Sequence, residues 1–183
     1  MGVTNLKVWQ LDFELDEYDN FIPVDKDDWD KLIFDGSLRE KNWTPVLIRK
    51  MEEKGLSDAP GLDTGIVVLN EKALNVLQDL IGEQVEILTL NYVEDNYYAI
   101  NVISVLNCID YDKSEFKRFK NSDRIMRFIK YYFKEDVIIG KNIFKISDEP
   151  KRKPFVSDLF KRRVEEYNLK GFKIKLVWTS DDK

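Results

Sequence analysis

Histidine is absent from this sequence of 183 residues, and cysteine occurs only once. Without histidine, the chain cannot form a Ser-His-Asp or Cys-His catalytic arrangement, or a zinc site with imidazole ligands. One cysteine cannot form a disulfide within the chain, which is consistent with a reducing compartment. Glycine and proline are also scarce, with 8 and 5 residues, so the sequence is not of low complexity.

Long apolar segments are lacking as well. No run approaches the roughly 20 apolar residues that a membrane-spanning helix needs, and residues 1–9 have neither the basic start nor the apolar centre of a signal peptide. We therefore expect a cytoplasmic protein that does not contact a membrane. The hydrophobic content of 43% and the aromatic content of 13% are sufficient for a core, and the length predicts a single domain over residues 1–183.

The charged residues are unevenly distributed along the chain. Residues 1–100 contain 21 acidic and 9 basic side chains, whereas residues 101–183 contain 13 and 20. The net charge of -5 therefore combines an acidic half of -12 with a basic half of +7. Residues 1–40 form an acidic N-terminal segment, and the acidic bias is strongest within residues 1–35. The two halves either neutralise each other in the fold or form two charged faces that steer a partner.

Two segments share the order strand, helix cap, helix, glycine, strand. In the first, a β-branched run precedes Asn70, whose side chain can cap a helix. An apolar stripe at helical spacing follows, and Gly82 is expected to end the helix in a left-handed conformation. In the second, Ser157 is the expected cap of a helix that carries Phe160, Val164 and Tyr167 on one face. The stripe of the first helix consists of Ala73, Leu74, Val76, Leu77, Leu80 and Ile81.

Apolar or alternating runs predict further strands, at residues 4–15, 45–51, 84–90, 97–106, 125–133, 142–146 and 172–178, and a helix is the alternative for residues 125–133. Residues 16–30 and 52–64 are expected to be loops, and Asp35-Gly36 is a turn signal. The predicted fold class is α+β, with a mainly antiparallel sheet of seven to nine strands and at least two helices. The two similar units suggest a weak internal strand-helix-strand repeat.

Two sites with candidate chemistry have simpler interpretations. Asp110, Asp112 and Ser114 carry alternating oxygens that suit Mg²⁺ or Ca²⁺, but the glycine and the terminal glutamate of a calcium-binding loop are missing. An Asx-type turn explains the same string. Cys108 has no histidine to activate it, so a buried small apolar residue is the expected role. No glycine-rich phosphate loop is present.

Two charged clusters are candidate binding surfaces. The first is acidic and surrounds an aromatic residue that can anchor a basic partner; it consists of Asp25, Asp27, Asp28, Trp29 and Asp30. The second is a basic run, Lys113, Lys117, Arg118, Lys120, Arg124 and Arg127, interleaved with Phe116, Phe119 and Phe128. Such a mixture is typical of nucleic-acid grooves, but acidic residues interrupt it and no recognisable nucleic-acid motif is present.

Four segments of the sequence are informative about a protein family because of the order in which they occur. They are GIVVLNEKALNVLQDLIG, YYAINVISVLNCIDYDKSEFKRF, RIMRFIKYYFKEDVIIGKNIFKI and FVSDLFKRRVEEYNLKGFKIKLVW. In this order they resemble the bacterial Imm11 family of predicted immunity proteins, over residues 60–178. The elements that carry the resemblance are Tyr98, Asn101, Val102, Asp110, Asp112, Ser114, the IFKI segment, Gly171, Phe172 and Trp178. None of them is a catalytic signature.

The resemblance implies an antidote of a bacterial polymorphic toxin system. Such a protein is encoded beside a toxin and protects the producing cell by binding the toxin stoichiometrically. The resemblance transfers no catalytic, cofactor-binding or metal-binding residues, so we expect no enzyme activity, no cofactor and a cognate toxin as partner, not a nucleic acid. Asp110, Asp112 and Trp178 either maintain the fold or contact the partner.

Two other functions stay open from the sequence. The basic half of the chain would serve a nucleic-acid-associated protein or an enzyme, and a structural accessory of a secretion system is a third interpretation. Gene neighbourhood distinguishes them, because a large secreted protein encoded upstream favours immunity. If the toxin is basic, the acidic cluster from Asp25 to Asp30 is the natural contact surface.

Overall fold

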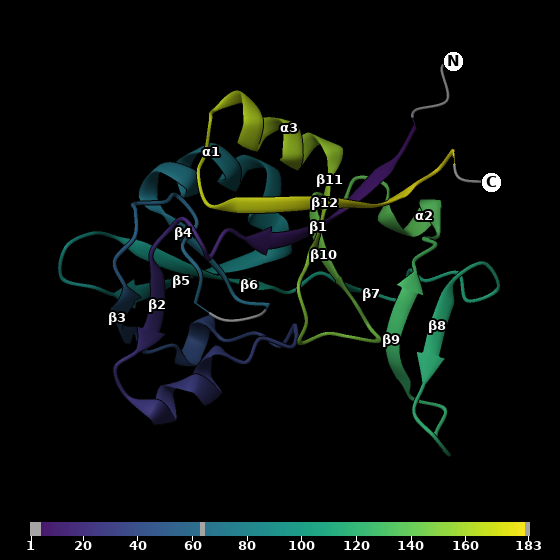
Figure 1. Ribbon diagram of the computed structural model, residues 1–183, viewed down its shortest axis with the longest axis horizontal. Helices are drawn as coiled ribbons and strands as arrows, with labels where there is room; N and C mark the ends of the chain where they lie inside the picture. The colour runs from purple at the N-terminus through teal and green to yellow at the C-terminus, as the bar shows by residue number, and fades with distance from the viewer. Residues whose placement is uncertain (1–4, 63–64, 182–183) are drawn as a thin grey trace.

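The computed structural model describes residues 5–62 and 65–181 of the chain. Within these residues the chain forms twelve strands, three α-helices and three short 3-10 helices. The strands are arranged in two five-stranded sheets and one separate hairpin (Figure 1). Because most neighbouring strands are antiparallel, the predicted α+β class with a mainly antiparallel sheet is confirmed.

The first sheet brings the two ends of the chain together. Its strands, in spatial order, are β12 (Phe172–Thr179), β1 (Lys7–Phe13), β11 (Phe155–Ser157), β10 (Ile143–Ile146) and β7 (Val105–Leu106). The strand β1 is antiparallel to β12 and pairs with it from Lys7 opposite Thr179 to Phe13 opposite Phe172. Only β10 and β7 run parallel in this sheet.

The second sheet is built from the middle of the sequence. Its strands, in spatial order, are β2 (Asn20–Pro23), β3 (Val46–Glu52), β5 (Val85–Asn91), β6 (Tyr97–Val102) and β4 (Val67–Asn70). The pair β3 and β5 is parallel, and the other neighbours are antiparallel. The chain leaves this sheet after β6 and enters the first sheet at β7, so one continuous segment connects the two sheets.

The expected internal repeat is present as a repeat of topology. The helix α1 (Glu71–Ile81) connects β4 to β5, and both strands are antiparallel to β6, which lies between them. The helix α3 (Asp158–Glu166) connects β11 to β12 in the same way, with β1 between these two strands. Each unit is therefore a strand-helix-strand connection around one inserted antiparallel strand.

Both predicted helix caps are confirmed. The Asn70 side chain accepts a hydrogen bond from the backbone N–H of Ala73 at 2.9 Å, and the Ser157 hydroxyl accepts one from Phe160 at 3.1 Å. Each bond satisfies one of the amides that a helix leaves unpaired in its first turn. The local sequence therefore determines where both helices begin.

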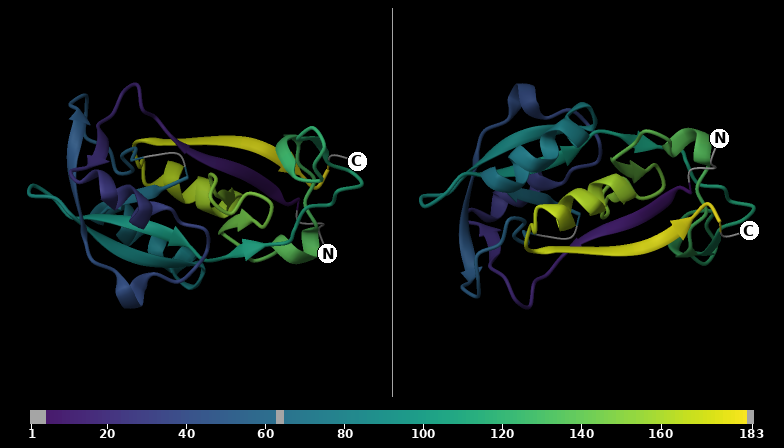
Figure 2. Two further views of the ribbon diagram at one scale, coloured as in Figure 1. Left: turned by 90° about the horizontal axis from the view of Figure 1, so that it is seen from below. Right: turned by 90° about the horizontal axis from the view of Figure 1, so that it is seen from above.

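The two helices pack against each other over a core shared by both sheets (Figure 2). The Arg163 guanidinium of α3 donates to the Val76 carbonyl oxygen of α1 at 3.0 Å and to the Asp79 carboxylate at 3.0 Å. Beneath this contact lie fully buried side chains from both units, among them Leu11, Leu69, Leu77 and Phe160. Removing each such side chain from water contributes roughly 1.5–3 kcal/mol.

The opposite faces of the two sheets are also covered. The second sheet is covered by the 3-10 helix η1 (Lys26–Leu32) and the following segment, with Phe21, Leu32 and Phe34 buried. The first sheet is covered by a cluster that includes Cys108, Phe133 and Trp178. Around these lie the 3-10 helices η2 (Glu40–Asn42) and η3 (Gly82–Gln84), the helix α2 (Glu135–Ile138), and the hairpin strands β8 (Glu115–Arg118) and β9 (Ile125–Lys130).

Several sequence predictions are wrong in detail. Residues 97–106 are two strands in different sheets, because the chain turns at Ile103 and Ser104, whose N–H groups both donate to the Gln84 carbonyl oxygen. Gly82 is right-handed, with φ of -53°, and continues into η3 instead of ending the helix in a left-handed conformation. Tyr167 follows the end of α3 and is exposed instead of packing with Phe160.

The expected loop over residues 16–30 and the expected strand count also need correction. Part of that acidic segment forms β2 and most of η1, and the described residues contain twelve strands where seven to nine were expected. The extra strands are short, so they carry little periodicity in the sequence. Among the described residues, no helix combines the length and apolar character needed to cross a membrane. That residues 1–183 form a single domain stays a prediction.

Candidate functional site

The acidic cluster is placed by a short helix on the surface of the second sheet. Asp25 is the N-cap of η1, and its carboxylate accepts a hydrogen bond from the Asp27 N–H at 3.0 Å. Asp27 and Asp28 occupy the first turn, where negative charge interacts favourably with the unpaired N–H groups. The acidic residues therefore stabilise the helix that carries them.

The five residues of the cluster have different surroundings. Asp25, Asp27 and Asp30 are exposed. Asp28 is largely covered and forms an ion pair with Lys31, with 2.6 Å between Nζ and Oδ1. Trp29 is half-buried and packs against the core of the second sheet. The segment thus presents three exposed carboxylates, one neutralised carboxylate and one anchored indole.

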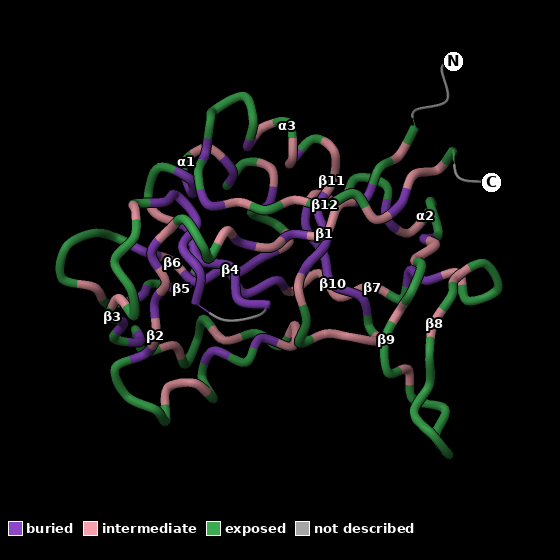
Figure 3. The backbone as a smooth tube through the Cα atoms, viewed as in Figure 1, coloured by how far each residue is buried: buried purple, intermediate pink, exposed green. Residues whose placement is uncertain are grey.

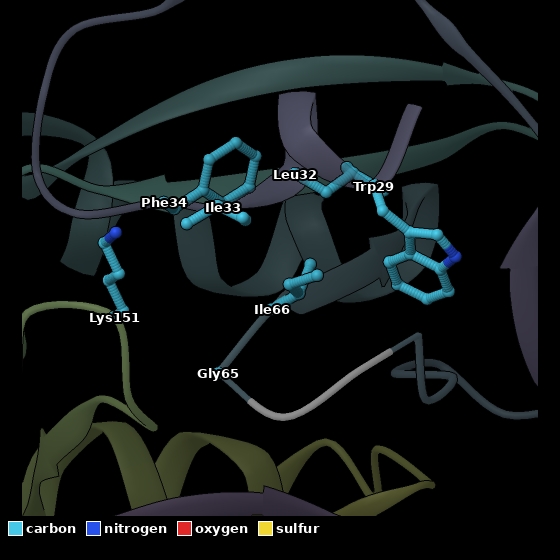
Figure 4. Close-up of a pocket in the computed structure, with 7 residues that line it drawn as sticks. All are labelled: Trp29, Leu32, Ile33, Phe34, Gly65, Ile66 and Lys151. Atoms are coloured by element: carbon cyan, nitrogen blue, oxygen red, sulfur yellow. The ribbon is translucent and has the colours of Figure 1, made fainter. Parts of the chain in front are cut away.

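A cleft of about 280 Å³ opens beside this helix. Its walls are mainly apolar, and the residues that line it are Trp29, Leu32, Ile33, Phe34, Gly65, Ile66 and Lys151. Trp29 and Lys151 lie at opposite ends of the cleft, with Ile66 between them (Figure 4). The cleft is large enough for one or two side chains, which is the size of a pocket that receives an anchor residue.

Exposed apolar side chains extend this surface. Val24 precedes the acidic cluster and Ile33 follows η1, and the two side chains are 49% and 43% exposed. An apolar centre with charged residues around it is the usual anatomy of a protein-protein interface.

A buried polar network holds the segment that follows the cleft. The Glu86 carboxylate accepts hydrogen bonds from the N–H groups of Arg39 and Glu40, at 2.7 and 3.1 Å. The side-chain amide of Asn101 donates to the Ser37 carbonyl oxygen and to Glu86, both at 2.8 Å. Asn101 is fully buried. The sheet thereby satisfies backbone groups of the irregular segment before η2 and of the first residue of η2.

Lys145 belongs to the same region and is buried in the middle of β10. Its ammonium group donates to the Phe34 carbonyl oxygen at 2.8 Å. Burial lowers the pKa of Lys145 to about 8, because the charged form loses its hydration, while the nearby Asp35 acts in the opposite direction. Phe34 lines the cleft, so Lys145 is a positioning residue for the candidate surface.

The predicted turn at Asp35-Gly36 completes the support of this segment. Gly36 has φ of +94°, which glycine adopts without strain. A Cβ atom at this position would lie 2.3 Å from Cγ2 of Val105. Hydrogen bonds from the N–H and the hydroxyl of Ser37 lower the pKa of the Asp35 carboxyl group. The turn therefore needs glycine for both its backbone conformation and its packing.

Asp110, Asp112 and Ser114 form a turn of the Asx type, which was the simpler alternative to a metal site. The Asp110 carboxylate accepts a hydrogen bond from the Asp112 N–H at 3.2 Å. The Ser114 hydroxyl accepts one from the Tyr132 N–H at 2.9 Å, which connects the turn to the segment that follows β9. Within the described parts of the chain, no three His, Cys, Asp or Glu residues converge as a metal site would require.

Cys108 and Trp178 are core residues. Burial raises the pKa of the Cys108 thiol to about 12, so the thiol is protonated at neutral pH and is a poor nucleophile. Trp178 is 1% exposed and packs edge-on against Phe133 at 5.7 Å between ring centroids. Of the two roles considered for Trp178, maintaining the fold and contacting a partner, its burial supports the first.

The basic run lies away from the acidic cluster, on the hairpin of β8 and β9 (Figure 1). Phe116 and Phe128 face each other across the two strands, with 5.8 Å between ring centroids. The acidic cluster and the basic run are thus carried by separate elements. Sequence reasoning found both clusters from their charge density, but it missed the cleft and the buried network.

The chain was compared with protein families and with curated proteins. The model of the immunity protein family Imm11 matches residues 17–178, nearly the whole chain. The chain therefore belongs to the Imm11 family of immunity proteins. The match includes the acidic cluster, which lies outside the residues 60–178 on which the resemblance rested. A comparison with curated proteins finds no match.

Proposed function

We propose that this protein is a cytoplasmic antidote that binds and neutralises the cognate toxin of a bacterial polymorphic toxin system, by stoichiometric protein-protein association and without catalysis. Membership of the immunity protein family supports this role. Cys108 is buried and protonated, and histidine is absent from the chain, which agrees with a function that depends on surface complementarity.

We place the binding surface where the acidic cluster and the cleft lie side by side. Asp25, Asp27 and Asp30 are exposed, and no ion pair within the described residues neutralises them. Trp29 links these carboxylates to an apolar cleft of about 280 Å³. Charges around the rim steer and orient a partner, and a filled apolar pocket supplies most of the affinity.

The chemistry of this surface defines the toxin surface that fits it. Three exposed carboxylates require lysine or arginine on the partner, and the cleft requires an apolar or aromatic side chain between them. A stable complex of standard size buries about 1,200–2,000 Å² in total. The contact therefore extends beyond the cleft, and the exposed Val24 and Ile33 lie where it would extend.

The proposal is tested by co-expression with the toxin encoded beside this gene. The test variant is Asp25→Asn with Asp27→Lys and Asp30→Lys. Asparagine at position 25 keeps the helix cap, so the variant removes or reverses three charges without removing the side chain that begins η1. The matched control, Glu53→Lys with Glu83→Lys and Glu166→Lys, changes exposed carboxylates elsewhere on the protein.

The wild-type protein and the control should protect cells and co-purify with the toxin, whereas the test variant should lose most of both activities. Trp29→Ala should weaken the complex further, because it removes one wall of the cleft. Equal protection by wild type and test variant, with both shown to be folded by circular dichroism, would refute the assigned surface. Failure of the wild type to protect would refute the proposed function itself.

A further inference from the structure

The hairpin of β8 and β9 forms a second charged surface, the basic arm (residues 113–130). It contains seven basic residues and two acidic ones, in a protein whose net charge is -5. The arm projects from the body at the end of the molecule away from η1, and it is largely exposed (Figures 1 and 3). Its strands pair only with each other among the described residues.

The arm is held in a fixed orientation by a chain of aromatic contacts. Phe128 pairs with Phe116, and it also stacks on Tyr131 with 4.9 Å between ring centroids. Tyr131 stacks on Phe133 at 5.8 Å, and Phe133 lies in the core cluster of the first sheet. Aromatic pairs of this kind add to the stability that burial provides. The exposed face of the arm is thereby presented without the entropic cost of ordering a mobile loop.

The outer face of the arm combines free positive charge with an apolar side chain. Lys117 and Arg127 are opposite each other across the strands, on the face away from the Phe116–Phe128 pair. Ile129 lies between the two β9 residues that pair with Glu115 and Phe116, and has no partner of its own on β8. Its side chain is 57% exposed. Within the described residues, the ion pair that involves the arm joins Lys113 to Asp110, so Lys117 and Arg127 are not neutralised.

Two aromatic rings of the arm each have one face covered by a cation of the arm itself, although Phe119 is still 42% exposed. The Arg118 guanidinium lies 4.9 Å from the centre of the Phe116 ring, and the Arg124 guanidinium lies 5.0 Å from that of Phe119. Single-stranded nucleic acids bind largely by stacking bases on open aromatic faces. Arg118 and Arg124 each cover one face of these rings, and the exposed apolar residue on the strand of Arg127, Ile129, is aliphatic and offers no ring for a base to stack on. A protein surface therefore fits Lys117, Arg127 and Ile129 better than a nucleic acid does.

We propose that the outer face of the basic arm is a second interaction surface, and that it binds an acidic protein surface in which apolar side chains lie between the carboxylates. Lys117 and Arg127 pair with the carboxylates, and Ile129 packs on the apolar side chains. This surface is separate from the acidic cluster and opposite to it in charge. The proposal therefore does not depend on the proposed toxin-binding function.

The test uses the full-length, isotope-labelled protein and two probes of equal negative charge. One probe is a synthetic peptide that repeats Glu-Glu-Leu, and the other is a single strand of oligothymidine. Chemical-shift changes of the backbone amides locate each binding site, and the titration gives its affinity. The test variant is Lys117→Glu with Arg127→Glu, and the matched control is Lys170→Glu with Lys175→Glu, which alters exposed lysines elsewhere.

The peptide should shift the amides of Lys117, Arg127 and Ile129. The test variant should bind it about tenfold more weakly, because two exposed ion pairs become two repulsive contacts. The control should bind it as the wild type does, and Ile129→Ala should weaken it by a smaller factor. Shifts elsewhere, equal loss in the control, or tighter binding of oligothymidine than of the peptide would each overturn the proposal.

Discussion

The lowered pKa of Lys145 predicts an unusual dependence of the free energy of unfolding on pH. The ordinary pKa of this lysine, 10.5, applies to the unfolded chain, and burial lowers the pKa to about 8 in the folded protein. A pKa difference of one unit corresponds to about 1.4 kcal/mol. Below pH 8 the lysine is charged in both states, and its burial as an ammonium ion costs the folded state about 3 kcal/mol relative to neutral lysine.

The sign follows from the protons bound in each state. Between pH 8 and pH 10.5 the unfolded chain holds a proton on Lys145 that the folded protein has released. The contribution of Lys145 to the free energy of unfolding therefore rises with pH across this window. The pKa values of Cys108, Tyr97 and Tyr111 are raised to about 12, so these groups act in the opposite direction at alkaline pH. The wild type and a Lys145 variant share these groups. The difference between their free energies of unfolding therefore reports on Lys145 alone.

The perturbation is Lys145→Met, which keeps an unbranched side chain, one atom shorter, and removes its charge. The variant escapes the cost of burying the ammonium ion but leaves the Phe34 carbonyl oxygen without its donor, which costs about 1–3 kcal/mol. The two effects offset each other at pH 7, so the variant should be within about 2 kcal/mol of the wild type. By pH 9.5 the wild type should gain about 2 kcal/mol over the variant.

The assay is urea denaturation followed by tryptophan fluorescence at pH 7 and pH 9.5, with equal slopes required in both proteins. The difference in unfolding free energy between wild type and variant is the quantity to compare. A difference that is the same at both pH values would refute the reasoning, because it would mean that Lys145 keeps its ordinary pKa in the folded protein.

Other predictions concern single contacts. Asn70→Ala removes the cap bond to Ala73 and should lower the free energy of unfolding by about 1 kcal/mol. Asn70→Ser keeps a capping oxygen without placing a second carboxylate beside Asp58, and an equal loss in both variants would contradict the assigned role. Gly36→Ala should cost about 1–3 kcal/mol in urea denaturation, because it places Cβ against Val105 at positive φ; unchanged stability would contradict this. Cys108 should resist a thiol reagent at pH 8 until urea is added, and rapid reaction of the native protein would show that it is accessible.

Features decided by neighbouring residues were predictable from the sequence. Asn70 and Ser157 each cap a helix through an amide three residues later, so both helix starts could be predicted from local pattern. Gly82 shows the limit of this approach. Glycine permits the left-handed conformation but does not require it, and the chain instead continues in a 3-10 turn.

Features decided by distant residues were not predictable in this way. The apolar run over residues 97–106 contains no signal for the point where the chain leaves one sheet for the other. The charge of the acidic cluster was visible, but the cleft beside it is lined by residues from distant parts of the chain, with Trp29 at one end and Lys151 at the other. Asn101 and Lys145 lie in segments that carry the family resemblance, and their roles became clear only from their hydrogen bonds in the fold.

The most direct test of the central claim is a calorimetric titration of the purified cognate toxin domain into this protein. One toxin should bind per chain, and the variant Asp25→Asn with Asp27→Lys and Asp30→Lys should bind at least tenfold more weakly than the control with altered Glu53, Glu83 and Glu166. Absence of binding by the wild type, or equal affinities of test variant and control, would contradict the account.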